Sequence, residues 1–330
     1  MTNNNKQIGM ARKQAKKNKR RKRRIKTIII FFLLIVGLGI GYGWHMVNQA
    51  MSTIDDSFVD DGRENGSDLR KEEIDTDKDN VSILFIGVDR GGGRSVENVN
   101  GLSDTLILAT FNKEEHSVKM VTIPRDSYVY LPLRDTHTKI NHAHSYDGTK
   151  GAILTVENLF DIPVDYYAKI NFDAFIDVVD ALGGIDVEVP YEMYEMDSHD
   201  TKNAIHLLPG EQRLNGEEAL ALARTRKYDS DIERGKRQQE IIKSIFDRAL
   251  SVNAVLNYNR LLSAVGDNMA TDVSSKDMKN LSTYLLDKDF NIETLTLKGS
   301  DMTTDLYYYK LDETHLEQVK RELKNHLKLE

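Results

Sequence analysis

Arginine side chains are concentrated in one short stretch of this sequence. Residues 224–237 read RTRKYDSDIERGKR and contain four arginines. Arg224 and Arg226 are two residues apart, so on an extended backbone their guanidinium groups project to the same side. The planar fork of a guanidinium pairs with two oxygens of one phosphate. The spacing therefore indicates a site for a phosphate or pyrophosphate group.

A helix is predicted to begin at Asp231, because Ser230 and Glu233 have the spacing of a capping box. The apolar residues that follow form one stripe at helical spacing, namely Ile241, Ile242, Ile245, Phe246 and Ala249. Asp231, Arg234 and Gln238 fall on this same stripe and are expected to point inward. The opposite side of the helix carries solvated charges, namely Lys236, Glu240, Lys243 and Asp247.

The inward placement of Arg234 favours an anion site, since a buried guanidinium needs a charged partner. The N-terminus of the helix also attracts anions. A second interpretation stays open, in which Asp229, Asp231 and Glu233 form surface ion pairs with the same arginines. Spacing alone does not decide between the two.

Two carboxylates and a fifth guanidinium are predicted to join this site. Asp89 ends an apolar run, and Asp104 precedes another in the sequence LSDT. Open α/β sheets bind ligands at such strand ends, and two carboxylates beside an anion suit Mg²⁺. Arg125 lies in the turn IPRD after the next strand. Each of the three residues has a plainer interpretation, as a cap or turn residue.

Other catalytic patterns are absent from the sequence. The nine histidines include no HExxH pair, and His137, His142 and His144, expected on one loop, are weak evidence for a metal. No GxSxG, Walker A or GxGxxG pattern occurs in its required context.

The residues that carry these side chains alternate between strand and helix patterns. Apolar runs predict strands at 81–89, 106–112, 117–126, 165–172, 185–190 and 291–297. Helical spacing predicts helices at 148–160 and 173–184, besides the one from Asp231. The alternation predicts an α/β fold with a layered sheet, formed by a single domain over 80–300. Residues 301–330 end in a charged amphipathic helix.

The N-terminal part of the chain predicts a membrane anchor. Residues 1–26 hold 12 of the 45 Lys and Arg and no acidic residue, which leaves 33 basic against 52 acidic residues beyond them. Residues 27–47 contain no charged side chain, and a helix of that length spans the roughly 30 Å hydrocarbon layer. The basic flank predicts a cytoplasmic N-terminus and a domain outside a single-pass membrane protein. The basic tail lacks any folded nucleic-acid reading motif, so no nucleic acid is expected as a partner.

Residues 48–79 are acidic, with few apolar side chains. Such a composition cannot bury a core, so it predicts a flexible, solvated stalk. The sequence contains no cysteine, so the outer domain is expected to fold without disulfides, as on a Gram-positive type of cell surface.

Several motifs, in order, resemble one known family. ILFIGVDR, LSDTLILATFN, MVTIPRDSYV, KINHAHSYDG, INFDAFIDVVDALGGIDVEVP, LARTRK and DIERGKRQ are similar to the LytR-CpsA-Psr family over about residues 80–250. The resemblance implies a central mixed β-sheet packed between helices, with an apolar tunnel for a polyprenyl tail. It implies a membrane-anchored phosphotransferase that moves teichoic acid or capsular polysaccharide from an undecaprenyl-pyrophosphate carrier to peptidoglycan, with Mg²⁺ assisting.

The resemblance also implies roles for individual residues. Asp89 and Asp104 become the carboxylates of the Mg²⁺ site. The pyrophosphate-binding set becomes Arg125, Arg224, Arg226, Asp231, Arg234 and Gln238, with Asp231 orienting the arginines. Asp89, Arg125, Arg224 and Arg226 are the predicted catalytic residues, and Asp89 is the candidate for assisting deprotonation of the acceptor hydroxyl.

The sequence departs from the family pattern at one position. Members usually carry an arginine before the Ser-Asp-Thr motif, where this chain has Leu102. The preceding loop is lengthened and contains Arg94, after three glycines. Either Arg94 folds back to replace the missing charge, or Arg94 is solvated and Leu102 covers the lipid entrance.

Two other functions remain compatible with the sequence. A hydrolase of the same lipid pyrophosphate would use the same site with water as acceptor. A membrane-anchored regulator of the cell envelope or of transcription would act through the cytoplasmic tail.

Overall fold

The computed structural model describes residues 57–63, 66–88, 101–225, 231–249, 269–285 and 291–329. The predicted basic tail and the predicted membrane-spanning helix lie outside these residues. Among the helices of the described parts, none has the length and apolar character needed to cross a bilayer.

A six-stranded sheet forms the centre of the fold, with the strand order β11-β6-β1-β2-β3-β12. The strands are β1 (Val81–Val88), β2 (Ser103–Asn112), β3 (Ser117–Thr122), β6 (Tyr166–Asn171), β11 (Met269–Thr271) and β12 (Asn291–Thr296). β1 and β6 run parallel, as do β3 and β12, whereas β2 is antiparallel to both β1 and β3. The prediction of a central mixed sheet is confirmed.

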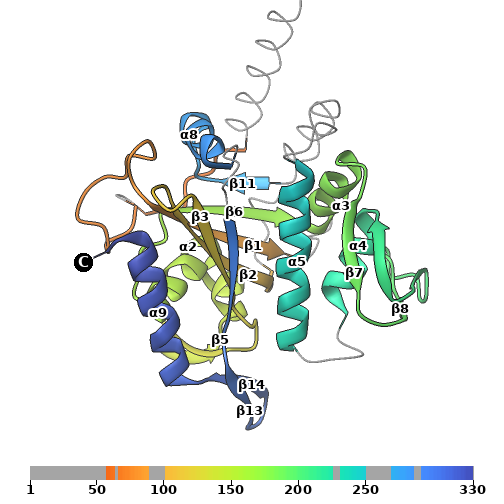
Figure 1. Cartoon of the computed structure of the whole chain (residues 1–330). Coiled ribbons are helices and arrows are strands. Elements are labelled where there is room, and N and C mark those ends of the chain that lie inside the picture. Colours follow the sequence, from red (N-terminus) through yellow and green to blue (C-terminus); the bar gives the residue numbers. More distant parts are fainter. Residues whose placement is uncertain are drawn as a thin grey trace, which may run out of the picture. The chain divides into compact units, whose positions relative to one another are not determined.

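Both faces of this sheet are buried, which explains why its strands read as continuous apolar runs. Leu84 and Ile86 of β1 point into one core, together with α2 (Asn141–Phe160) and α9 (Glu313–Leu327). Ile83 and Ile107 point into a second core, which α8 (Ser275–Leu285) and α5 (Asp231–Ala249) help to cover. Figure 1 shows α9 and α5 against the sheet.

A third packing unit lies beyond α5 and carries Arg224. It contains α3 (Phe172–Ala181), α4 (Gly216–Arg224), β7 (Ile185–Val189), β8 (Met193–Glu195), β9 (Ile205–Leu207) and β10 (Gly210–Leu214). The antiparallel pairs are β7 with β10 and β8 with β9. Gly216 allows α4 to approach α3, because a Cβ at this position would collide with the backbone of Ile176.

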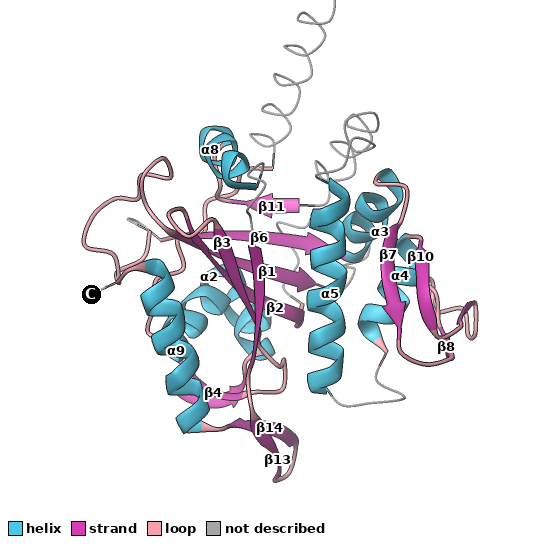
Figure 2. Ribbon diagram, in the orientation of Figure 1, coloured by secondary structure: helices cyan, strands magenta, loops and turns pink. Residues whose placement is uncertain are grey.

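Two further hairpins extend from the sheet at the lower end of the view in Figure 2. One consists of β4 (Tyr128–Leu131) and β5 (Thr136–Lys139), and the other of β13 (Gly299–Thr303) and β14 (Tyr307–Leu311). The sequence interpretation missed both, because their strands are short and carry polar or aromatic side chains on the exposed face.

The segment predicted as a solvated stalk contacts the domain at several points of its described part. Phe58 pairs with Thr271 through a β-bridge, and Arg70 forms hydrogen bonds to both carboxylate oxygens of Asp165, at 2.7 and 2.6 Å. Thr76 donates a hydrogen bond to Asp277 at 2.6 Å. The prediction failed there because the segment is stabilised by polar contacts with the domain rather than by an apolar core of its own.

Two other boundaries differ from the predictions. The limit of the domain at residue 300 is wrong, since β13 crosses it and α9 places Val319 and Leu323 in the main core. His142 and His144 lie in the first part of α2 rather than on a loop; this helix is kinked at Gly148, whose φ is 63°.

Candidate functional site

Three strands bring polar side chains to one edge of the central sheet. The parallel strands β1 and β6 both end there, and the antiparallel β2 begins there. Gly87 pairs with Thr105 and Val88 with Ser103, so Asp104 is the extra residue of a β-bulge. A bulge redirects side chains at the end of a strand. The edge of the sheet therefore presents Asp104, beside the end of β6 at Asn171.

Arg125 meets Asp104 at this edge. Its Nη1 donates a hydrogen bond to the carboxylate of Asp104, and its Nε lies 3.8 Å from Asp126. The side chains of Arg125 and Asp104 are each 26% exposed, so the pair is open to a ligand from solvent. Asp104, predicted as a metal ligand, and Arg125, predicted to bind the anion, thus form a hydrogen-bonded ion pair.

The end of α4 is fixed by side chains from α5. Arg237, which is buried, donates hydrogen bonds to the carbonyls of Leu222 and Thr225, at 3.2 and 2.9 Å. Gln238 donates to the carbonyl of Ala223 at 3.2 Å. These bonds satisfy carbonyls that a helix C-terminus leaves without intrahelical partners. They hold α4 so that Arg224, its last residue, faces the edge of the sheet.

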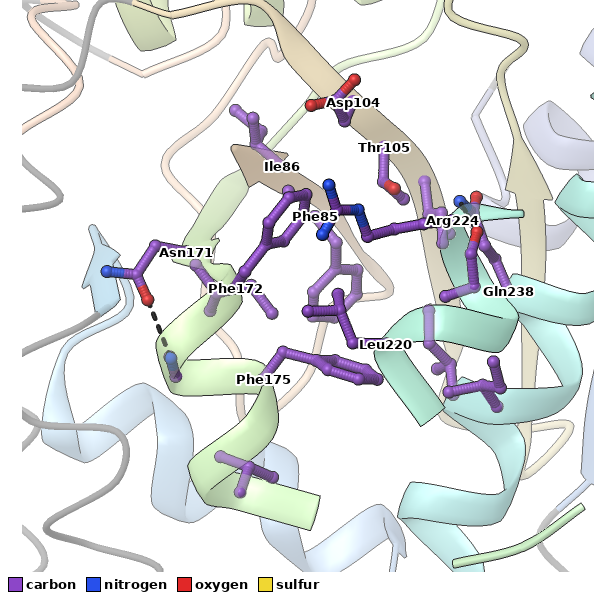
Figure 3. A pocket seen from close by; sticks show the side chains of 18 of the residues that line it. Phe85, Ile86, Asp104, Thr105, Asn171, Phe172, Phe175, Leu220, Arg224 and Gln238 are labelled. Carbon is purple, nitrogen blue, oxygen red and sulfur yellow. Dashed lines mark hydrogen bonds between the residues drawn. The ribbon is translucent and has the colours of Figure 1, made fainter. Parts of the chain in front are cut away.

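A cavity of about 520 Å³ connects these groups. Its polar lining consists of Asp104, Thr105, Arg125, Asn171, Arg224, Arg234 and Gln238. Most of the rest is apolar, from β1, β2, α3, α4 and α5, and includes Phe85, Ile107, Phe172, Phe175, Leu220, Ile241 and Ile245. Figure 3 shows Asp104 at the rim and the Arg224 side chain extending toward Phe172. The guanidinium carbon of Arg224 lies 5.0 Å from the centroid of that ring, within the range of a cation–π contact.

The structure thus brings together five of the predicted site residues: Asp104, Arg125, Arg224, Arg234 and Gln238. α5 begins at Asp231, as predicted, and it buries Arg234 and Gln238 while Lys236 stays exposed. The inward stripe is therefore confirmed for these two side chains.

Other predicted residues are not placed. Asp89, Arg94 and Arg226 lie outside the described residues, and the side chain of Asp231 is likewise not described. Leu102 is 44% exposed and does not line the cavity, so it does not cover the cavity as described.

Several lining residues were not predicted from the sequence. Phe85 and Ile107 belong to strands that are apolar throughout, and such a run does not reveal which face borders a cavity. Asn171 carried a usable signal, because an Asn before a helix is a common N-cap. Its side chain accepts a hydrogen bond from the backbone N–H of Ala174 at 2.8 Å.

His144 holds the backbone segment that leads to Asp104. Its Nδ1 lies 2.8 Å from the carbonyl oxygen of Gly101, which can only accept, so Nδ1 carries the proton. The ring is fully buried, and burial lowers the pKa of His144 to about 4. The neutral ring thus fixes the backbone two residues before the start of β2.

The donor chemistry of the pocket fits a magnesium ion held jointly with a substrate. Among the described residues that line the pocket, Asp104 is the one with a carboxylate. No group of three or more His, Asp or Glu side chains arranged to hold a metal occurs among the described residues. Mg²⁺ commonly binds one or two carboxylates together with the phosphate oxygens of a substrate. Asp104 with a bound pyrophosphate would meet that requirement.

The cavity combines apolar walls with a cationic end, an arrangement that suits an amphiphile with an anionic head group. The chain belongs to the LytR_cpsA_psr family, whose model matches residues 42–325.

Two curated relatives and one solved structure illustrate the similarity. An uncharacterized protein of Staphylococcus aureus is 40% identical over 74% of this chain, which spans 61% of that relative. The polyisoprenyl-teichoic acid–peptidoglycan teichoic acid transferase TagT of Bacillus subtilis is 37% identical, over 89% of this chain and 91% of the relative. The structure of TagT with bound octaprenyl pyrophosphate lipid is 35% identical, with a TM-score of 0.65, and covers 81% of this chain and 98% of that chain.

Proposed function

We propose that this protein transfers an anionic glycopolymer, teichoic acid or capsular polysaccharide, from a polyprenyl-pyrophosphate carrier to peptidoglycan. The observation that carries the proposal is one cavity that combines apolar walls with a cationic end. Its apolar walls suit a polyprenyl chain, and its cationic end suits a pyrophosphate. Relatives named as teichoic acid transferases, and one bound to octaprenyl pyrophosphate, support the same ligand.

The chain's own residues act by holding charge and position. Arg125, Arg224 and Arg234 would bind the pyrophosphate, and the apolar wall would orient the lipid so that the polymer-linked phosphorus faces solvent. A hydroxyl of the acceptor attacks that phosphorus, and the bond between the phosphorus and the oxygen bridging to the lipid phosphate breaks. The hydroxyl proton leaves, and polyprenyl phosphate departs with the bridging oxygen. The guanidinium groups stabilise the negative charge that develops on this leaving group.

Magnesium is part of the proposal. Asp104, with Asp89 as its predicted partner, would hold the ion against the pyrophosphate. When bound, Mg²⁺ neutralises charge on the phosphate oxygens. Asp89 stays the candidate for assisting deprotonation of the acceptor.

The proposed location is the cell membrane, with residues 27–47 spanning the bilayer and the described domain outside. Protease added to intact protoplasts would then remove the domain and spare the basic N-terminal tail. Protection of the domain from protease would contradict this topology and the access to peptidoglycan that the function needs.

The function is tested with the full chain in detergent, a polyprenyl-pyrophosphate-linked polymer and purified peptidoglycan sacculi. The expected result is polymer attached covalently to the sacculi, together with release of polyprenyl phosphate. Release at the same rate without sacculi, and without attached polymer, would identify a hydrolase instead. Absence of both products with Mg²⁺ present would contradict the enzymatic function.

A further inference from the structure

A cluster of aromatic side chains lies on the two hairpins that follow Arg125 and precede α9. Strand pairing sets Tyr128 opposite Lys139 and Tyr130 opposite His137, whereas Val129 and Leu131 point into the core from the other face. Tyr307 and Tyr308 of β14 complete the cluster. We call Tyr128, Tyr130, His137, Tyr307 and Tyr308 the aromatic platform.

Four of the five rings contact one another, and Tyr307 shares with Tyr308 a contact with Lys139. The centroids of Tyr128 and His137 are 5.6 Å apart, with an interplanar angle of 29°. Tyr308 meets Tyr128 edge-on at 5.1 Å and 75°, and Tyr130 lies 5.2 Å from His137. Such geometries are those of stabilising aromatic pairs. The platform is therefore a preorganised surface.

Solvent reaches the platform although its rings are in contact. Tyr128 and Tyr307 are each 40% exposed. Contact between the two hairpins explains the Tyr128–Tyr308 pair, and Tyr128 still exposes part of its ring to solvent beside it. Clustered exposed apolar surface of this kind marks binding sites.

Carboxylates surround the ring edges. The hydroxyl of Tyr130 donates to Asp135 at 2.8 Å, and that of Tyr307 donates to Asp301 at 2.9 Å. Lys139 lies 5.8 Å from the centroid of Tyr308, but it forms an ion pair with the buried Asp126 at 2.7 Å. Aromatic faces beside carboxylates suit a sugar ring, whose C–H groups stack on the faces and whose hydroxyls donate to the carboxylates.

The platform is linked through the backbone to the cationic end of the cavity. Tyr128 follows Arg125 by three positions, which limits their backbone distance to about 10 Å. The backbone N–H of Tyr309 donates to the carbonyl of Asp126 at 2.8 Å, and that of Asn141 donates to the carbonyl of Arg125 at 3.2 Å. The backbone that positions Arg125 thus also positions the platform.

The geometry points to the aromatic platform as the binding site for the glycan strand of peptidoglycan, the acceptor of the proposed transfer. Asp126 and Lys139 form an ion pair, so the carboxylates of Asp135 and Asp301, which accept from Tyr130 and Tyr307, are the acceptors beside the rings. Such acceptors suit the hydroxyls of an uncharged sugar backbone, as in peptidoglycan, rather than the phosphates of an anionic donor polymer. The inference rests on the proposed function and adds the location of its second substrate.

Co-sedimentation with sacculi stripped of their polymer tests the platform directly. Tyr128→Ala and Tyr308→Ala in the full chain should each weaken binding about fivefold to tenfold, as loss of one aromatic contact implies. Tyr128→Phe keeps the ring and should bind like the wild type. Tyr194→Ala is the matched control, because Tyr194 is a 43% exposed tyrosine stacked on His206 at 4.2 Å in a different hairpin.

Two further measurements separate the explanations. Binding of a fluorescent polyprenyl pyrophosphate should be unchanged in Tyr128→Ala, which also shows that the variant is folded. If both alanine variants bind sacculi as tightly as the wild type does, the platform is not the acceptor site, whether or not the wild type transfers polymer. Loss of binding to the free anionic polymer, with binding to sacculi retained, would assign the platform to the donor and also overturn the inference. Failure of the wild type to transfer polymer would contradict the proposed function, while the sedimentation result would still decide the platform.

Discussion

Arg125 and Arg224, two of the described arginines that line the cavity, are held in different ways. Arg125 is oriented by its ion pair with Asp104, so its position depends on the bulge in β2. Arg224 lies over the ring of Phe172 at the end of α4, an arrangement that supports the guanidinium plane and leaves its edge for oxygen ligands. These placements lead to different expectations for substitution.

Arg224→Lys should lose affinity for polyprenyl pyrophosphate although it keeps the charge. An ammonium group cannot reproduce the bidentate fork or its stacking on Phe172. One charge-assisted hydrogen bond contributes about 1.5–3 kcal/mol, so affinity should fall by about one to two decades. Titration of the purified chain with the lipid measures this.

Arg213→Lys is the control for this substitution, because Arg213 forms an exposed ion pair with Asp186 outside the cavity. Lipid affinity equal to that of the wild type in Arg224→Lys would show that Arg224 is a surface residue.

Asp104→Asn should raise the Mg²⁺ concentration required for transfer. The amide keeps the size of the side chain and one oxygen, but it loses the charge that Arg125 contacts and that would hold Mg²⁺. Activity measured over a range of Mg²⁺ concentrations checks this, with thermal unfolding as the test of folding. An unchanged Mg²⁺ requirement would remove Asp104 from the metal site.

At the scale of elements, the sequence predicted the strands that have two buried faces and the long amphipathic helices. β1 and α5 are examples, since a continuous apolar run and a single apolar stripe are each strong local signals. β4, β5, β13 and β14 were missed, because these short strands carry polar or aromatic side chains and contain no long apolar run. The polar end of the site was predicted through charged side chains, whereas the apolar wall was not, since Phe85 reads like any other core residue.

The contact between α4 and α5 gives a prediction at this scale. Arg237→Met keeps the length of the side chain but removes the donors to the carbonyls of Leu222 and Thr225. Leaving buried acceptors unsatisfied costs about 1–3 kcal/mol in the free energy of unfolding. Urea denaturation should show this loss, and lipid affinity should fall as well, because Arg224 is no longer held.

Lys236→Met is the matched control, since Lys236 is the exposed neighbour on the same helix. If Arg237→Met is as stable as Lys236→Met, the hydrogen bonds from Arg237 do not fix the end of α4.

At the scale of the whole molecule, segments far apart in the sequence close the edges of the sheet. Residues 57–59 pair with β11, and α9 places His326 against β2 and β3, where its ring contacts Thr110 at 2.8 Å and Ser117 at 2.9 Å. Asp272, next to β11, accepts a hydrogen bond from the backbone N–H of Tyr167 at 2.7 Å. Several of these junctions bury a titratable group, so the stability of the domain depends on pH.

Burial shifts the pKa values of two buried groups, Asp272 and the His144 ring of α2, in opposite directions. It lowers the pKa of His144 to about 4, from an ordinary 6.5, and raises that of Asp272 to about 7, from 3.8. Between pH 4 and 6.5 the unfolded chain binds a proton at His144 that the folded chain does not, so this histidine makes stability rise with pH. Between pH 4 and 7 the folded chain keeps a proton on Asp272 that the unfolded chain has lost, so this carboxyl makes stability fall with rising pH.

Substitution should therefore change the pH profile of unfolding in opposite ways. Relative to the wild type, His144→Asn should lose stability as the pH rises from 4 to 6.5, by up to about 3 kcal/mol. Asp272→Asn retains an acceptor for the N–H of Tyr167, and it should gain stability relative to the wild type as the pH rises from 4 to 7. Urea denaturation at several pH values measures both differences, with the exposed Asp305→Asn as a control that shows neither. Parallel profiles for the wild type and both variants would show that these groups ionise alike in the folded and unfolded chain.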